Sequence, residues 1–143
     1  MFAVPIRPVD EGWEFVYYGL TEMGNSQVAR YLDRLSGKDS ESVDYVATML
    51  QDLEEYGLER VSYNRLQGCC NLELRVSKES PKPLRILARA ATIKNRSVVI
   101  LLKIDDPHKG KTNKFSPKMI KEANRLALEI QGWIDKGGSL DEL

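Results

Sequence analysis

Hydrophobic and polar residues alternate in two neighbouring stretches in the middle of the chain. Residues 72–76 carry leucine or valine at every second position, with Arg75 among the polar residues between them. This period of two is typical of a strand with one buried and one exposed face. Residues 84–91 repeat the pattern, and the prolines in the polar segment between the two stretches exclude regular sheet there. We therefore expect one sheet face to present Arg75, Arg85 and Arg89 together.

Three further segments have the composition of strands. Residues 13–18 are rich in aromatic and β-branched side chains and are predicted to form the first strand. Residues 59–66 favour an extended conformation. Residues 97–104 are almost continuously apolar, which is typical of a central strand covered on both faces. Because residues 94–96 and similar short turns link the later strands, we expect these strands to be antiparallel.

The first half of the chain also holds two segments with apolar residues at helical spacing. Asn25 or Ser26 is predicted to cap the first helix, which ends at residues 36–39. The second helix follows Ser40 as its cap, covers about residues 41–56 and stops at a glycine. The apolar stripes are Val28, Tyr31, Leu32 and Leu35 in the first helix and Val43, Val46, Ala47, Leu50 and Leu53 in the second. The short connection predicts an antiparallel helical hairpin.

A third helix is predicted near the C-terminal end. Ser116 suits the N-cap and Pro117 the first helical position. Gly137 and its neighbours end this helix. Its apolar stripe is Ile120, Ala123, Ala127, Ile130 and Ile134. The order of an N-terminal strand, a helical hairpin, three to four further antiparallel strands and a C-terminal helix predicts an α+β fold.

The length and composition suit one domain. The 143 residues, 42% of them apolar, are enough to enclose a hydrophobic core. We expect a single domain over residues 1–143, with a core at about 13–135 and irregular ends at 1–12 and 136–143. No apolar run reaches the roughly 20 residues that span a bilayer, and the first residues lack the pattern of a signal peptide. The expectation is a cytoplasmic protein that does not associate with membranes.

The cysteine and histidine content argues against a metal site. Cys69 and Cys70 are adjacent, and adjacent cysteines rarely bridge each other. With the single histidine, they are too few for a four-ligand zinc site within one chain. We therefore expect two reduced thiols, no bound metal and no cofactor.

The formal net charge is zero, but the two halves of the chain differ strongly. Residues 1–60 hold 5 Lys/Arg and 12 Asp/Glu, a net charge of −7, whereas residues 61–143 hold 16 and 9, a net charge of +7. Residues 61–125 alone hold 15 and 5, a net charge of +10. Such a split favours a surface that binds a polyanion, opposite an acidic surface with another role.

A series of short motifs follows the same order as the predicted elements. They are Trp-Glu-Phe-Val-Tyr-Tyr at 13–18, the hairpin ending at Gly57, Arg65-Leu66-Gln67-Gly68, Leu72-Glu73-Leu74-Arg75, Leu84-Arg85-Ile86-Leu87, Ile100-Leu101-Leu102, and Lys111-Thr112-Asn113-Lys114 before Ser116-Pro117. In order and spacing they resemble the RelE/HigB-like toxins of bacterial type II toxin–antitoxin systems. The phage-derived branch of this RelE/ParE superfamily is the most similar, and the resemblance covers about residues 13–130.

The resemblance implies a metal-independent endoribonuclease that cuts mRNA on the ribosome and so inhibits translation. A base takes the proton of a ribose 2′-hydroxyl, the oxygen attacks the adjacent phosphate, and an acid protonates the leaving 5′-oxygen. Fixed positive groups stabilise the charge that builds on the phosphorane, and arginine suits this role because its planar fork matches phosphate oxygens. The implied partners are mRNA and a cognate helix-turn-helix antitoxin, which silences the toxin in a hetero-oligomer.

The strand arginines of the family match Arg75 and Arg85. Arg85 is expected to stabilise the transition state, and Arg75 to hold the RNA backbone. His108 is a candidate acid or base because its pKa in solution lies near neutrality, although a lone loop histidine is more often simply solvated. The residues expected to bind RNA are Arg89, Lys103, Lys109, Lys111 and Lys114. For the arginines, the alternative role is solvation of an exposed strand face.

Three departures from the family pattern leave the acid and the base unassigned. Ala88 stands where an aromatic residue often occurs, Lys103 stands where histidine is common, and no tyrosine follows Tyr63. Two alternative functions therefore stay open. One is a non-catalytic member that binds RNA or the ribosome through the same face. The other is an inhibitor of gyrase, as in the ParE branch of the superfamily.

Overall fold

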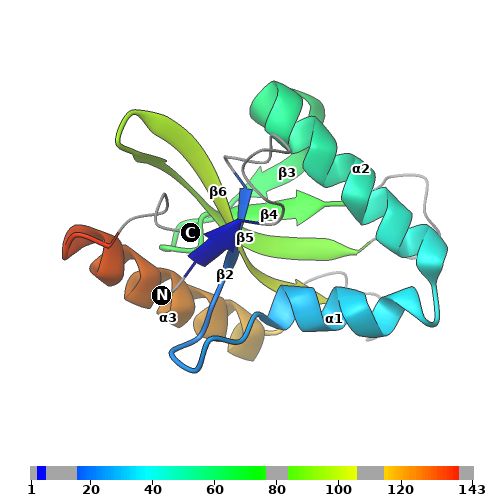
Figure 1. Cartoon of the computed structure of the whole chain (residues 1–143), viewed down its shortest axis with the longest axis horizontal. Helices are drawn as coiled ribbons and strands as arrows, with labels where there is room; N and C mark the ends of the chain where they lie inside the picture. Colours follow the sequence, from blue (N-terminus) through cyan, green and yellow to red (C-terminus); the bar gives the residue numbers. More distant parts are fainter. Residues whose placement is uncertain (1–2, 6–15, 77–83, 106–114, 139–143) are drawn as a thin grey trace.

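The computed structural model describes residues 3–5, 16–76, 84–105 and 115–138. Within this part of the chain, six strands and three α-helices form (Figure 1). The strands are β1 (Ala3–Pro5), β2 (Val16–Gly19), β3 (Ser62–Arg65), β4 (Leu72–Arg75), β5 (Arg85–Ile93) and β6 (Arg96–Asp105). The helices are α1 (Gln27–Ser36), α2 (Ser40–Tyr56), the 3-10 helix η2 (Gly57–Arg60) and α3 (Pro117–Asp135). The predicted α+β class is confirmed.

The strands form one mixed sheet in the order β1-β2-β6-β5-β4-β3. Neighbours from β3 to β6 are antiparallel, as their short connections predicted. Lys94 and Asn95 form the turn between β5 and β6 with positive φ values of 52° and 63°, as two-residue hairpin turns often require. β2 runs parallel to β6, with Val16 opposite Val99. β6 therefore lies inside the sheet, as expected for its long apolar run.

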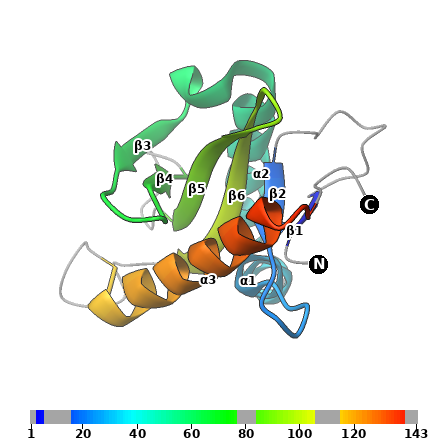
Figure 2. The same cartoon turned by 90° about the vertical axis from the view of Figure 1, so that its left-hand side faces the viewer.

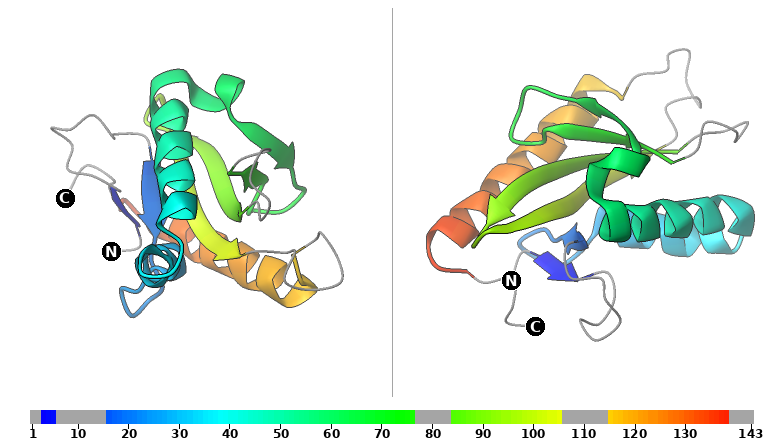
Figure 3. Two further views of the ribbon diagram at one scale, coloured as in Figure 1. Left: turned by 90° about the vertical axis from the view of Figure 1, so that its right-hand side faces the viewer. Right: turned by 90° about the horizontal axis from the view of Figure 1, so that it is seen from above.

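Each face of the sheet has its own hydrophobic core. α1 and α2 cover one face, and α3 lies diagonally across the other (Figures 2 and 3). The core beneath α1 and α2 includes Val46, Leu50, Leu74, Ile86 and Leu101. The core beneath α3 includes Leu87, Ile100, Leu102, Ala127 and Ile130. Because each large apolar side chain stabilises the fold by about 1.5–3 kcal/mol when buried, the alternation along β5 and β6 fixes which face meets which helix.

A β-bulge in β6 changes this alternation near the end of the strand. Leu87 pairs with Lys103 and Ala88 with Leu101, so Leu102 is the extra residue. Leu102 packs in the core beneath α3, and Lys103 forms an ion pair with Glu122 of α3. The bulge therefore turns two successive side chains toward α3 before Ile104 returns to the core beneath α1 and α2.

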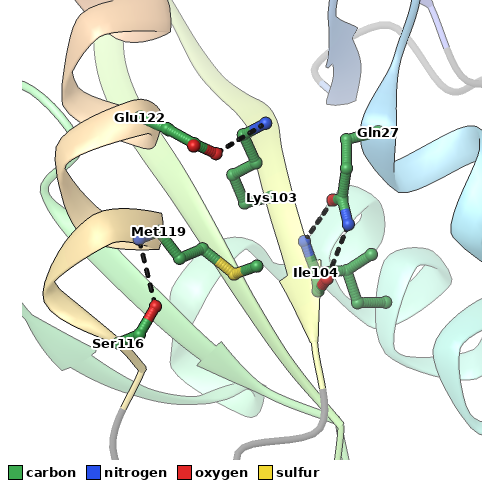
Figure 4. Close-up of polar contacts among 6 residues, drawn as sticks. All are labelled: Gln27, Lys103, Ile104, Ser116, Met119 and Glu122. Carbon is green, nitrogen blue, oxygen red and sulfur yellow. Dashed lines mark hydrogen bonds and ion pairs between the residues drawn. The ribbon is translucent and has the colours of Figure 1, made fainter.

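A side-chain amide continues the hydrogen-bonding ladder of β6 at this point. Gln27, the first residue of α1, donates from Nε2 to the carbonyl oxygen of Ile104 at 2.9 Å. Its Oε1 accepts from the amide nitrogen of Ile104 at 2.8 Å (Figure 4). The amide thus pairs with β6 as a residue of a neighbouring strand would. This pair of bonds fixes the start of α1 against the end of the central strand.

The helix ends follow the capping rules, with one correction. Ser26 caps α1 by accepting from the amide of Ala29 at 3.1 Å, and Ser116 caps α3, with Pro117 at its first position. The prediction that Ser40 caps α2 is wrong, because Ser40 is already helical. The side chain of Asp39 is the cap and accepts from the amide of Ser42 at 3.1 Å. A carboxylate at this position also interacts favourably with the helix dipole.

Other boundaries also differ from the predictions. Residues 1–12, expected to be irregular, contain β1, which pairs antiparallel with β2. The first predicted strand is seen from Val16 onward, while Trp13–Phe15 lie outside the described residues. Glu59 and Arg60 belong to η2, so only Ser62–Arg65 of the extended segment pair as a strand.

The apolar stripe of α2 is buried only in part. Val46, Leu50 and Leu53 lie in the core, and Met49 joins them, but Ala47 is exposed and Val43 only half-buried. α2 is therefore rotated toward Met49 relative to the face expected from the sequence. Among the helices that the structure describes, none has the length and apolarity needed to cross a membrane.

Candidate functional site

Arg75 and Arg85 lie directly opposite each other on β4 and β5. Their neighbours Leu74 and Ile86 point into the core beneath α1 and α2. The two arginines therefore project from the other face, the one that α3 partly covers. Directly opposite side chains in a sheet have Cβ atoms about 4.5–5.5 Å apart, and like charges at this spacing destabilise the pairing. Such a pair needs a compensating negative charge.

Glu73 supplies part of this compensation. Its Oε1 lies 3.7 Å from Nη1 of Arg85, and both side chains are nearly buried, at 11% and 12% exposed. Its Oε2 accepts a hydrogen bond from Nδ2 of Asn64 on β3 at 2.9 Å. We call Asn64, Glu73, Arg75 and Arg85 the arginine cluster. Three strands position it, and Asp105, the residue opposite Arg85 on β6, places a second carboxylate beside it.

Arg75 retains unused hydrogen-bonding capacity. Its Nε is buried and finds no hydrogen-bond acceptor among the residues that the structure describes. A buried donor without an acceptor costs about 1–3 kcal/mol. An oxyanion bound at this position would accept a hydrogen bond from Nε. The arrangement is thus suited chemically to binding a phosphate group.

Glu73 was missed as a site residue in the sequence. The alternation along residues 72–76 could have identified it, because it places Glu73 and Arg75 on the same face of the strand. A lone carboxylate among arginines nevertheless looks like an ordinary solvated residue until its contacts with Arg85 and Asn64 are known.

Arg89 lies further along β5 on the same face, but its donors are already engaged. Nη1 donates to the carbonyl oxygen of Cys69 at 3.0 Å. Nε and Nη2 donate to Oε1 of Gln131 on α3 at 3.2 and 3.0 Å. Arg89 thus ties the loop before β4 to α3. Its predicted role in RNA binding stays a prediction, and a structural role is evident.

Lys103 is engaged in a similar way. Its Nζ lies 3.7 Å from Oε2 of Glu122 on α3, in the contact drawn in Figure 4. The bulge in β6 aims Lys103 at α3, which a simple alternation of the strand does not predict. Lys103 therefore shares a sheet face with the arginine cluster, while its charge is offset by Glu122. Whether it binds RNA stays a prediction.

The loop between β3 and β4 is held by two asparagine side chains. Asn71 donates to the carbonyl oxygen of Ala90 at 2.9 Å and accepts from its amide at 2.7 Å. Asn124 of α3 accepts from the amide of Cys70 at 2.9 Å. A Cβ at Gly68 would lie only 2.2 Å from Oδ1 of Asn124, so a larger residue there would displace the Asn124 side chain from its present position. These contacts fix the start of β4, the strand that carries Glu73 and Arg75.

Both cysteines lie in this loop and are free. Cys70 is buried, and burial raises the pKa of its thiol to about 11. The thiolate is the reactive form of cysteine, so Cys70 is chemically inert at neutral pH. Cys69 is half-buried, and its contribution to the site is the carbonyl oxygen that Arg89 binds.

Other predicted site residues are not brought together by the described structure. His108, Lys109, Lys111 and Lys114 lie outside the described residues. Ala88, where an aromatic residue was expected, is buried in the core beneath α1 and α2. It points away from the arginine cluster, so a larger side chain there would enter the core and not the site.

No group of three or more potential metal ligands occurs among residues 3–5, 16–76, 84–105 and 115–138. Comparison with protein-family models, with curated proteins and with solved structures found no match. A function for this chain must therefore be argued from the chain's own residues and their geometry.

Proposed function

We propose that this protein is a toxin of the RelE/HigB kind that binds mRNA through the arginine cluster and cleaves it, acting on ribosomes in the cytoplasm under the control of a helix-turn-helix antitoxin. The observation that carries the proposal is the pair of opposed arginines, of which Arg75 keeps a buried donor with no acceptor among the described residues. The net charge of +10 over residues 61–125 supports an anionic partner.

In the proposed reaction, Arg75 and Arg85 hold the oxygens of the scissile phosphate. The ribose 2′-oxygen loses its proton to a base and attacks phosphorus, and the bond from phosphorus to the 5′-oxygen breaks as an acid protonates that oxygen. The products are a 2′,3′-cyclic phosphate and a 5′-hydroxyl. Arg85, oriented by Glu73, stabilises the additional negative charge of the phosphorane.

A second candidate function is RNA or ribosome binding without cleavage. It is favoured by the state of Glu73, the carboxylate of the arginine cluster. Both of its oxygens are engaged, one with Arg85 and one with Asn64. A carboxylate whose two oxygens are both held by neighbouring side chains is poorly placed to take a proton from a substrate. Under this alternative, the cluster binds the RNA backbone but promotes no proton transfer.

The test measures cell growth on expression of the protein and mRNA cleavage by the purified protein. Expression of the wild-type chain should arrest growth, and purified protein should cut mRNA on translating ribosomes. Arg85→Ala should relieve the arrest and slow cleavage by roughly 100-fold or more, the usual loss for a donor aimed at transition-state charge. Arg34→Ala, which removes an exposed arginine of α1, is the matched control and should behave as wild type.

Two outcomes would change the assignment. A wild-type chain that is harmless in the absence of an antitoxin would contradict the toxin function. Binding to ribosomes or RNA that depends on Arg75 and Arg85, without any cleavage, would establish the non-catalytic alternative.

A further inference from the structure

The outer surface of α3 carries a row of exposed basic residues that the sequence analysis did not assign to a function. Lys118, Lys121 and Arg125 are all exposed. Spacings of three and four residues place them on one side of the helix. At 1.5 Å per residue, the row extends over about 10 Å of the helix axis. We call these three residues the α3 ridge.

The basic residues of the α3 ridge outnumber the acidic residues beside them. Glu122 directs its carboxylate to Lys103 on the sheet (Figure 4), and Glu129 lies one turn beyond Arg125, at the end of the ridge. None of the three ridge side chains forms an ion pair with another described residue. The ridge therefore presents three positive charges to solvent.

Helix stability does not explain this placement. The first turn of α3 contains Lys118 and no acidic residue. A cation near a helix N-terminus opposes the helix dipole and costs about 0.3–1 kcal/mol. By contrast, α2 has Glu41 in its first turn and Asp39 at its cap, as the dipole favours. The position of Lys118 is therefore not explained by the stability of α3.

The ridge begins at the end of the sheet where the arginine cluster lies. Glu122 sits over Lys103, and Lys103 pairs with Leu87, two residues from Arg85 along β5. Arg85 itself pairs with Asp105, the last residue of β6. The first turns of α3 therefore pass over the same end of the sheet, as the start of the helix does in Figure 2.

We propose that the α3 ridge binds the phosphate backbone of the RNA strand that the arginine cluster holds, at nucleotides flanking the bound phosphate. This inference rests on the proposed function and deepens it, since it adds a second contact region to the same substrate. It assigns Lys118, Lys121 and Arg125 to RNA binding through charge, without base recognition. RNA long enough to reach both regions should bind more tightly than RNA that reaches the cluster alone.

The test uses fluorescence anisotropy with a 20-nucleotide 2′-O-methyl RNA, which lacks the nucleophilic hydroxyl and is not cleaved. The ridge variant carries Lys118→Gln, Lys121→Gln and Arg125→Gln. The matched control carries Arg30→Gln, Arg34→Gln and Lys38→Gln, which remove three exposed charges from α1 and the turn after it. Because only exposed residues change, both variants should melt as cooperatively as wild type.

We expect the ridge variant to bind roughly tenfold or more weakly at low salt. The slope of log K against log salt should fall in magnitude by about 2, because three contacts to a single strand contribute about 0.7 each. The control should differ from wild type by less than about twofold, since its charges lie away from the proposed contact. A five-nucleotide RNA should show a smaller difference between wild type and the ridge variant.

The outcomes separate this inference from the proposed function. Equal losses in the ridge variant and the control, or no loss in either, would overturn the ridge as a binding surface. Loss of binding in the ridge variant alone, in a protein that cleaves no RNA, would leave the ridge established and remove the nuclease. Cleavage by the wild type together with unchanged binding by the ridge variant would support the nuclease function and overturn the ridge as a binding surface.

Discussion

Glu73 on β4 and Arg85 on β5 form an ion pair across the strands, with 3.7 Å between Oε1 and Nη1. The pair is diagonal in the sheet, because the residue directly opposite Arg85 is Arg75. Glu73 on β4 and Asp105, which lies opposite Arg85 on β6, thus place two carboxylates beside the opposed arginines. This relationship links β4 and β5 through the side chains of the arginine cluster.

Replacing Glu73 by glutamine should destabilise the fold and increase its response to anions. Glutamine keeps the hydrogen bond to Asn64 but leaves Arg75 and Arg85 without the carboxylate. We expect the free energy of unfolding in urea to fall by about 2 kcal/mol. Because an anion that binds the folded state stabilises it, sulfate should restore part of this loss.

The control for this prediction is Glu59→Gln, which removes an exposed carboxylate from η2. Sulfate stabilises proteins in general, so the relevant quantity is the extra stabilisation of the Glu73 variant over the control, measured against chloride at equal ionic strength. An equal response of the two variants would contradict an anion site at the cluster.

Replacing Arg89 by lysine separates a structural role from RNA binding. Lysine keeps the charge but cannot reproduce the fork that reaches both Cys69 and Gln131. We expect the free energy of unfolding to fall by about 1–3 kcal/mol, while RNA affinity of the folded protein stays within about twofold of wild type, because the charge is kept. Arg34→Lys is the exposed control, and wild-type stability of the Arg89 variant would refute its structural role.

Replacing Gln27 by glutamate tests the side-chain ladder at the end of β6. A carboxylate has no donor for the carbonyl oxygen of Ile104 and places negative charge against it. We expect a loss of about 2 kcal/mol in the free energy of unfolding at neutral pH. Below about pH 4 the carboxyl group regains a proton that it can donate, so the difference from wild type should shrink.

Gln67→Glu provides the comparison, since Gln67 is exposed. Chemical denaturation at pH 7 and pH 3.5 gives the measurement. A Gln27 variant that loses no more stability than the Gln67 variant would show that the contact with Ile104 contributes little.

Cys70 should make stability dependent on alkaline pH. Burial raises the pKa of its thiol from an ordinary value of 9.0 to about 11, so the folded state holds this proton more tightly than the unfolded state does. Its contribution to stability is therefore complete below pH 9 and is lost as the pH rises to about 11. The slope is at most about 1.4 kcal/mol per pH unit.

Urea unfolding between pH 8 and 11 measures this slope. Cys70→Ala should flatten it, and Cys69→Ala should leave it unchanged. Burial also raises the pKa of Tyr18, so some alkaline loss should persist in both variants. The same slope in the two variants would contradict the assignment to Cys70.

Much of the fold follows from local patterns in the sequence. The alternation in β4 and β5 and the apolar run of β6 report burial directly, because each side chain faces one of two cores. Ser26, Ser116 and Pro117 act at helix ends through contacts within one turn of the chain. For the same reason, the opposition of Arg75 and Arg85 was predictable in part, as both lie on the exposed parity of neighbouring strands.

The remaining features depend on contacts between distant segments. The bulge at Leu102 changes the direction of Lys103 without any change in local composition. The engagement of Arg89 depends on Gln131, which lies 42 residues further along the chain. β1 is only three residues long and is defined by its partner β2. Such interactions carry no periodic signal, so local patterns cannot reveal them.

The position of β6 in the sequence has a consequence for the folding of the protein during its synthesis on the ribosome. β2 and the start of α1 are synthesised before β6, the strand with which both of them pair. Gln27 and its hydrogen-bonding partner Ile104 are 77 residues apart in the sequence. Closing such long loops is slow relative to local helix formation. The nascent N-terminal segment therefore cannot complete its fold until β6 has emerged. A truncated chain that ends before β6 lacks the strand that lies between β2 and the strands of the arginine cluster, so any activity of the cluster requires a chain that extends at least through β6.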